Sequence, residues 1–227
     1  MRGGKVTLTL FILKDRLEFI RRFYETAAKP FEEIKRKIGE SEAPYDNPPY
    51  SEDGLPPFLD EWQEAEESLQ FLGHACVSML AAVLRLYFNV WERELGRTLD
   101  DSCREQGWIN KYAACFKRNF GIDFRDGPSD LSLLEEIVLA RNRIQHPEYI
   151  ASPGPNYSRS DLEKLPRALF IDDVERLLFM DEGKRLTPWL TPCVSVPGEK
   201  LRKALEQVGT FADWLERQIA KRLARDI

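Results

Sequence analysis

The chain has 227 residues, of which 43% are hydrophobic and 31% are charged. This balance is typical of a globular protein and excludes the fibrous and intrinsically disordered classes. The 33 Lys and Arg residues and 38 Asp and Glu residues give a formal net charge of −5. Because an acidic surface repels phosphate groups, any binding of nucleic acid requires a local basic patch.

The first two predicted elements are long helices. Apolar residues recur at helical spacing over residues 7–38, with charges on the other face and a bend expected at Pro30. Residues 40–57 are rich in Pro and Gly and predict a loop. A second helix is expected over 58–96, and its polar residues share one narrow stripe. It is therefore predicted to be the central helix, covered by other elements.

Two shorter helices are expected next, over residues 101–119 and 131–146. Ser129 or Asp130 is suited to cap the start of the second of these. Pro147 ends it, because a proline ring disfavours helical geometry in the residue before it.

Residues 147–199 form a turn-rich insertion. Within it, segments 168–171 and 176–179 next to the turn residues 181–184 suggest a small β-hairpin. Residues 172–178 also fit a short helix, and periodicity cannot separate the two.

A strongly amphipathic helix is expected over residues 197–227. The predicted fold class is mainly α, an antiparallel helical bundle forming a single domain over residues 1–227. Its core helices lie within about residues 7–150, followed by the insertion and the C-terminal helix.

The sequence predicts a cytoplasmic protein without a membrane partner. The apolar run 8–13 stops at charged residues without a cleavage site, which is unlike a signal peptide. The apolar run 75–84 is too short for a membrane span. The cysteines lack disulfide or zinc-site spacing and are expected to be reduced thiols. They are Cys76, Cys103, Cys115 and Cys193.

Histidine chemistry depends on two residues, His74 and His146. His74 lies in the polar stripe of the central helix, where a solvent-facing or hydrogen-bonded side chain is the ordinary explanation. His146 closes the fourth helix. On a helical wheel Arg141 falls inside the apolar arc of that helix, where a guanidinium needs a partner. Asn142 and His146 are one turn apart, so three polar groups converge at one helix end.

At Arg141, Asn142 and His146 the chain resembles the HEPN superfamily of all-α domains, which are marked by an Arg, often an adjacent Asn, and a His a few residues later. The order of helices over about residues 7–150 agrees. The resemblance implies a HEPN-like bundle and a metal-independent endoribonuclease whose two motifs meet across a homodimer interface. It further implies a toxin–antitoxin, antiviral or RNA-processing setting, in which an antitoxin or other protein partner is expected.

The implied reaction needs no cofactor, because RNA supplies its own nucleophile, the 2′-OH. His146 is expected to move the proton, Arg141 to stabilise charge on the phosphorane, and Asn142 to orient His146 or the phosphate. The cations expected to bind RNA are Lys117, Arg118 and Arg143.

One departure from the family pattern limits the prediction, and a possible metal site is also excluded. HEPN toxins paired with nucleotidyltransferase antitoxins often carry a Tyr two residues after the His, whereas this position is Glu148 and the tyrosine is Tyr149. Tyrosine nucleotidylation is therefore not predicted. Glu61, Glu64 and Glu67 have metal-helix spacing, but no partner motif completes a di-metal site.

Two alternatives remain open from the sequence. The first is a non-catalytic HEPN-like module for dimerisation or protein interaction. In it the motif residues satisfy polar groups in a buried dimer interface, and the C-terminal helix binds a partner protein. The second is an unrelated bundle in which Arg141 and His146 only cap a helix, and a monomer in solution favours it.

Overall fold

The computed structural model describes residues 3–48, 54–94, 107–146, 154–165, 167–179 and 191–224. These residues are mainly helical, and the only pairing of β type among them is a single antiparallel bridge between Asn156 and Cys193. The helices, in chain order, are α1 (Gly3–Glu40), α2 (Leu59–Glu94), α3 (Trp108–Phe120), the 3-10 turn η1 (Phe124–Asp126), α4 (Leu131–Gln145), α5 (Arg159–Lys164), α6 (Asp173–Phe179) and α7 (Gly198–Leu223).

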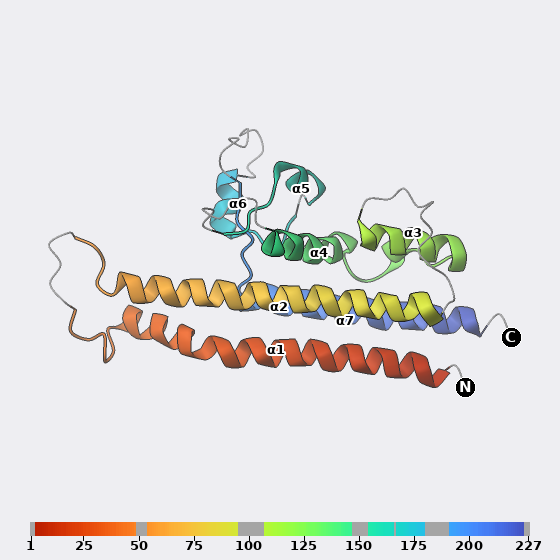
Figure 1. The fold of residues 1–227 in the computed structure, drawn as a ribbon, viewed down its shortest axis with the longest axis horizontal. Coiled ribbons are helices and arrows are strands. Elements are labelled where there is room, and N and C mark those ends of the chain that lie inside the picture. The colour runs from red at the N-terminus through yellow and green to blue at the C-terminus, as the bar shows by residue number, and fades with distance from the viewer. Residues whose placement is uncertain are drawn as a thin grey trace.

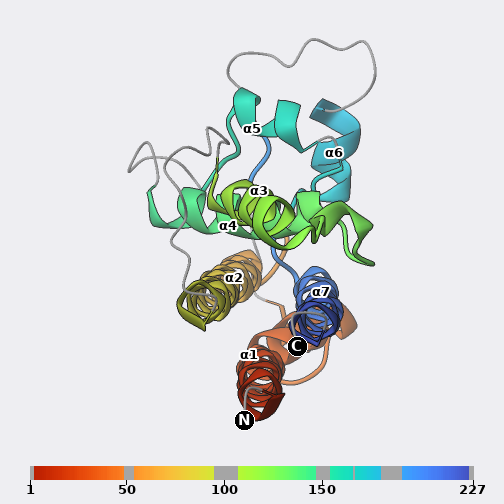
Figure 2. The ribbon, with the colours of Figure 1, turned by 90° about the vertical axis from the view of Figure 1, so that its right-hand side faces the viewer.

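The helices are stacked in layers. Helices α1, α2 and α7 run side by side as the longest elements, and α4 packs across α2 and α7 (Figures 1 and 2). Helix α3 lies in the same layer as α4, while α5 and α6 lie on the side of α4 away from the long helices (Figure 2). Because α7 packs against α1 and α2, the C-terminal helix belongs to the bundle that the N-terminal helices begin.

Four of the predicted helices are confirmed to within a few residues. They are α1, α2, α4 and α7, whose ends follow the Pro and Gly signals of the sequence. Helix α1 runs through Pro30 to Glu40. Helix α3 begins at Trp108, later than predicted, and residues 101–106 of that prediction lie outside the described residues.

The core forms around α2, as its wide apolar surface predicts. Phe88 is fully buried and stacks on Tyr112 of α3, with ring centroids 4.6 Å apart. The same ring contacts Phe124 of η1 and Phe211 of α7, so one aromatic cluster joins four elements. By length and composition α2 is also long and apolar enough to cross a membrane, unlike the short apolar run that the sequence predicts. Half of its apolar 18-residue window is buried inside the protein.

The expected hairpin is not found among the described residues. Residues 176–179 belong to α6, because the Asp172 carboxylate accepts a hydrogen bond from the Val174 amide at 2.8 Å and starts that helix. Residues 168–171 form turns, in which the amides of Leu169 and Phe170 bond to the carboxylate of Glu136 rather than to a neighbouring strand. The expected turn residues 181–184 lie outside the described residues.

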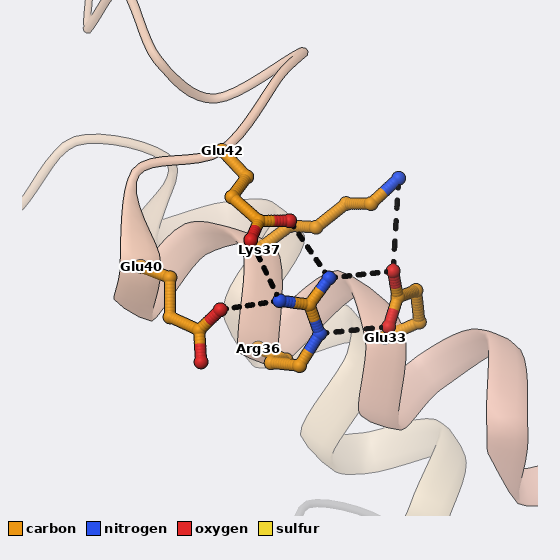
Figure 3. Close-up of polar contacts among 5 residues, drawn as sticks. All are labelled: Glu33, Arg36, Lys37, Glu40 and Glu42. Atoms are coloured by element: carbon orange, nitrogen blue, oxygen red, sulfur yellow. Dashed lines mark hydrogen bonds and ion pairs between the residues drawn. The ribbon is translucent and has the colours of Figure 1, made fainter.

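The end of α1 is held by a network of ion pairs (Figure 3). Arg36 donates to Glu33 at 2.8 Å, to Glu42 at 2.8 Å and to Glu40. Glu42 follows the helix, so the guanidinium ties the start of the loop to the last turn of α1. Hydrogen bonds from Arg36 hold the carboxyl pKa of Glu33 and Glu42 below its ordinary value.

Candidate functional site

The predicted motif lies in the last turn of α4. This helix begins at Asp130, whose carboxylate accepts a hydrogen bond from the Ser132 amide at 2.9 Å, as the sequence predicts. The helix ends at His146, whose backbone N–H donates to the Asn142 carbonyl at 3.0 Å. Both ends of α4 are therefore defined by local contacts, which place the motif in the last turns of the helix.

Two of the three motif side chains are joined directly. Arg141 is half-buried, and its Nη1 donates to Oδ1 of Asn142 at 2.9 Å. Asn142 and His146 are exposed. Among the described residues, no hydrogen bond links the His146 ring to Arg141 or Asn142. Arg141 thus has the partner that its apolar setting requires, while the imidazole is open to solvent and to a ligand.

A cavity of about 540 Å³ lies beside the motif. Asn142 lines it together with Glu135, which is seven residues earlier and on the same face of α4. The first turn of α3 contributes Trp108 and Asn110, and Lys164 at the end of α5 completes the polar lining. The cavity therefore combines an aromatic ring, two amides, a carboxyl group and an ammonium group.

Glu135 is a residue of this cavity that the sequence did not identify. Burial raises the pKa of its carboxyl, against a hydrogen bond from Asn110 and the charge of Lys164, which lower it. The heptad spacing of Glu135 and Asn142 is a signal that both lie on one helix face. The contribution of α3 and α5 has no local signal, because these elements meet α4 only in the fold.

Arg143 is engaged inside the protein. Its Nε lies 2.7 Å from Oδ2 of Asp161, whose side chain is only 4% exposed. Asp161 also accepts a hydrogen bond from the Ser158 amide at 2.8 Å in the capping box that starts α5. Arg143 therefore connects α4 to α5, and its role in binding RNA stays a prediction.

Lys117 and Arg118 are exposed in the last turn of α3, at the end away from Trp108. Lys117 lies 2.8 Å from the carboxylate of Asp123, which also pairs with Arg125. The hydrogen bonds from Arg125 and Lys117 lower the pKa of this carboxyl. These two cations are not brought to the cavity beside Asn142, and their role toward RNA also stays a prediction.

His74 has a structural contact. Its Nε2 lies 2.8 Å from the carbonyl oxygen of Val194, so that nitrogen carries the proton and donates. Burial lowers the pKa of the ring, which favours the neutral imidazole. This is the hydrogen-bonded role that its place in the polar stripe of α2 predicts.

A larger cavity, about 860 Å³, lies between the start of α4, α6 and the start of α7. Its lining mixes acidic and basic side chains. Glu136 lies at its wall and is 2% exposed, accepting hydrogen bonds from the amides of Leu169 and Phe170 and from the Tyr157 hydroxyl. This carboxyl holds residues 168–171 against α4, which is a structural task.

No group of three or more acidic, histidine or cysteine side chains in the described part of the chain is arranged to hold a metal ion. The chain matches no protein-family model, no characterised protein and no solved structure.

Proposed function

We propose that this protein is a cytoplasmic, metal-independent endoribonuclease of HEPN-like fold that acts as a homodimer with a composite site, in a toxin or antiviral setting. The observation that carries the proposal is the end of α4, where Arg141 donates to Asn142 and His146 is exposed. A cation and an exposed imidazole within one and a half helical turns can supply two functions that cleavage of RNA through its 2′-OH uses, charge stabilisation and proton transfer.

In the proposed reaction His146 accepts the proton of the 2′-OH as the 2′ oxygen attacks the phosphorus. The bond from phosphorus to the 5′ oxygen breaks, the leaving oxygen takes a proton from solvent water, and a 2′,3′-cyclic phosphate remains, after which His146 releases its proton to solvent. Arg141 stabilises the negative charge of the phosphorane. Asn142 is a positioning residue, because its carbonyl oxygen holds the guanidinium of Arg141.

The cavity beside Asn142 is proposed to receive a nucleobase next to the cleaved phosphate. Trp108 offers an aromatic surface of the kind on which bases stack, and the amides and the carboxyl of Glu135 offer donors and acceptors to base edges. Since Asn142 is shared by the motif and the cavity, a base held there lies beside the catalytic groups.

The test is cleavage of a labelled single-stranded RNA in excess EDTA by the wild type and by His146→Ala and Arg141→Ala. We expect each variant to lose at least about 100-fold in rate. The matched control is Arg202→Ala, an exposed arginine on α7 that should leave the rate unchanged. Circular dichroism and melting curves verify that every variant is folded.

Equal cleavage by all four proteins would identify a contaminating nuclease and overturn the proposal. If none of them cuts any RNA tested, the second candidate, a non-catalytic HEPN-like interaction module, is favoured. A specific observation supports that candidate, since large apolar side chains are exposed along α1 and α2.

A further inference from the structure

The outward side of α2 exposes an apolar stripe that no described helix covers. Phe71 is 73% exposed, Leu86 56% and Val90 36%. Ala75 and Ala82 between them are exposed as well, and Met79 is half-buried. We call this set the α2 stripe. At a rise of 1.5 Å per residue it extends over about 29 Å of helix.

The α2 stripe is opposite the core face of the same helix. Buried residues such as Leu80, Leu84 and Trp91 point into the bundle, about half a turn away on the helical wheel. In both views no described helix covers the side of α2 away from α7 (Figures 1 and 2). Contiguous exposed apolar surface of this length marks an interaction site.

The spacing within the stripe is that of a two-helix seam. Ala75, Met79, Ala82 and Leu86 are separated by four, three and four residues, the pattern of coiled-coil contacts. Two antiparallel copies of α2 centred between residues 80 and 81 place Ala75 level with Leu86 of the other copy. They also place Met79 level with Ala82. Each large side chain then faces a small one, and symmetry repeats each contact.

The charges at the ends favour the same antiparallel arrangement. From residue 68 to residue 91 the only charged side chain is Arg85, which lies over the ring of Trp108 at 5.1 Å. Glu64 and Glu67 are exposed before the stripe, and Arg93 and Glu94 are exposed after it. In this antiparallel register Arg93 of each copy lies level with Ser68 of the other, one residue from Glu67, while Glu94 lies level with Glu67. Parallel pairing brings like charges together at both ends.

We infer that the α2 stripe is the homodimer interface, with two copies of α2 packed antiparallel about residues 80 and 81. The inference rests on the proposed function for the identity of the partner, a second copy of this chain, and adds the surface and the register. It makes the exposed side of α2 a buried seam in the assembled protein.

The test is the molar mass of the full chain in solution, measured by light scattering over a range of concentrations. The wild type is expected at twice the 26.4 kDa chain mass. Leu86→Glu buries an unpaired charge in the seam, so the dimer dissociation constant is expected to rise roughly 100-fold. The matched control is Leu177→Glu on α6, where the leucine is 73% exposed and outside the stripe, and the dimer persists.

A charge exchange tests the register. Arg93→Glu places like charges together at both ends and weakens the dimer, and combining it with Glu64→Arg and Glu67→Arg restores it. Any of three results overturns the inference. The wild type is a monomer, the dimer is unaffected by Leu86→Glu, or the charge exchange fails to restore the dimer. A monomer that binds phosphatidylcholine–phosphatidylglycerol vesicles through Leu86 overturns it in favour of a bilayer.

RNA cleavage by the same variants separates this inference from the proposed function. A dimer with the expected sensitivities that cuts no RNA leaves the interface standing and removes the ribonuclease. Cleavage by a wild-type monomer overturns the interface and the composite site, and leaves only the ribonuclease activity of the proposed function.

Discussion

Glu216 is a carboxyl group buried between α2 and α7. It is 4% exposed, its Oε1 accepts a hydrogen bond from the Tyr87 hydroxyl at 3.3 Å, and its Oε2 has no hydrogen-bond partner in the described part of the chain. Burial raises the pKa of Glu216 to about 7, and the nearby Asp213 adds to the effect. The folded state therefore holds this proton more tightly than the unfolded state, in which the pKa is near its ordinary value.

The consequence is a stability that falls as pH rises. The contribution of Glu216 is fully present below about pH 4.5, is lost progressively up to about pH 7, and amounts to about 3 kcal/mol. We expect Glu216→Gln to flatten this dependence and to raise the free energy of unfolding at pH 8. Urea unfolding between pH 5 and pH 8 measures it, with Glu206→Gln, an exposed glutamate of the same helix, as control. A variant that keeps the wild-type pH profile contradicts the prediction.

Among the elements, α4 and α5 are joined by the ion pair of Arg143 and Asp161. Replacing Arg143 by alanine leaves a carboxylate buried without its cation, so we expect the free energy of unfolding to fall by about 3 kcal/mol. Chemical denaturation measures the loss. Arg159→Ala on α5 is the control, because its pair with Glu163 is exposed at 3.7 Å and is expected to contribute little.

The same variant separates a structural role from an RNA-binding role. An unchanged free energy of unfolding combined with weaker RNA binding contradicts the structural assignment of Arg143 and restores the prediction from the sequence. Filter binding of the same labelled RNA to the folded variant gives the second measurement.

At the scale of the whole molecule, Gly73 allows residues 194–196 to lie directly on α2. A Cβ at this position would lie 2.2 Å from the carbonyl oxygen of Val196, which is backbone and cannot turn aside. The same stretch is held by His74, by the side chain of Gln70 and by a hydrogen bond from the Ser195 amide to Phe170. An added methyl group therefore disrupts the contact between the insertion and the central helix.

We expect Gly73→Ala to lower the free energy of unfolding by about 1–2 kcal/mol, because overpacking outweighs the gain in helix propensity. Gly209→Ala on α7 is the matched control. Its Cβ would meet only Leu17 at an ordinary 3.7 Å, so we expect a gain of up to about 1 kcal/mol. Thermal melts of both variants measure the difference, and equal shifts in the same direction contradict it.

The sequence by itself determined the long helices. The periods, caps and prolines of α1, α2, α4 and α7 act within a few residues of each other, so local pattern was enough to place them. The motif at Arg141, Asn142 and His146 was likewise visible, since Asn142 and His146 are spaced by about one helical turn and Arg141 is adjacent.

The tertiary structure alone decided which groups surround that motif. Arg143 meets Asp161 across 18 residues, and Asn110 reaches Glu135 across 25. The segment 168–171 forms turns instead of the predicted strand, because the carboxylate of the distant Glu136 accepts hydrogen bonds from the amides of Leu169 and Phe170. Contacts between elements depend on how helices pack, and the hydrophobic period that predicts each helix carries no information about its neighbours.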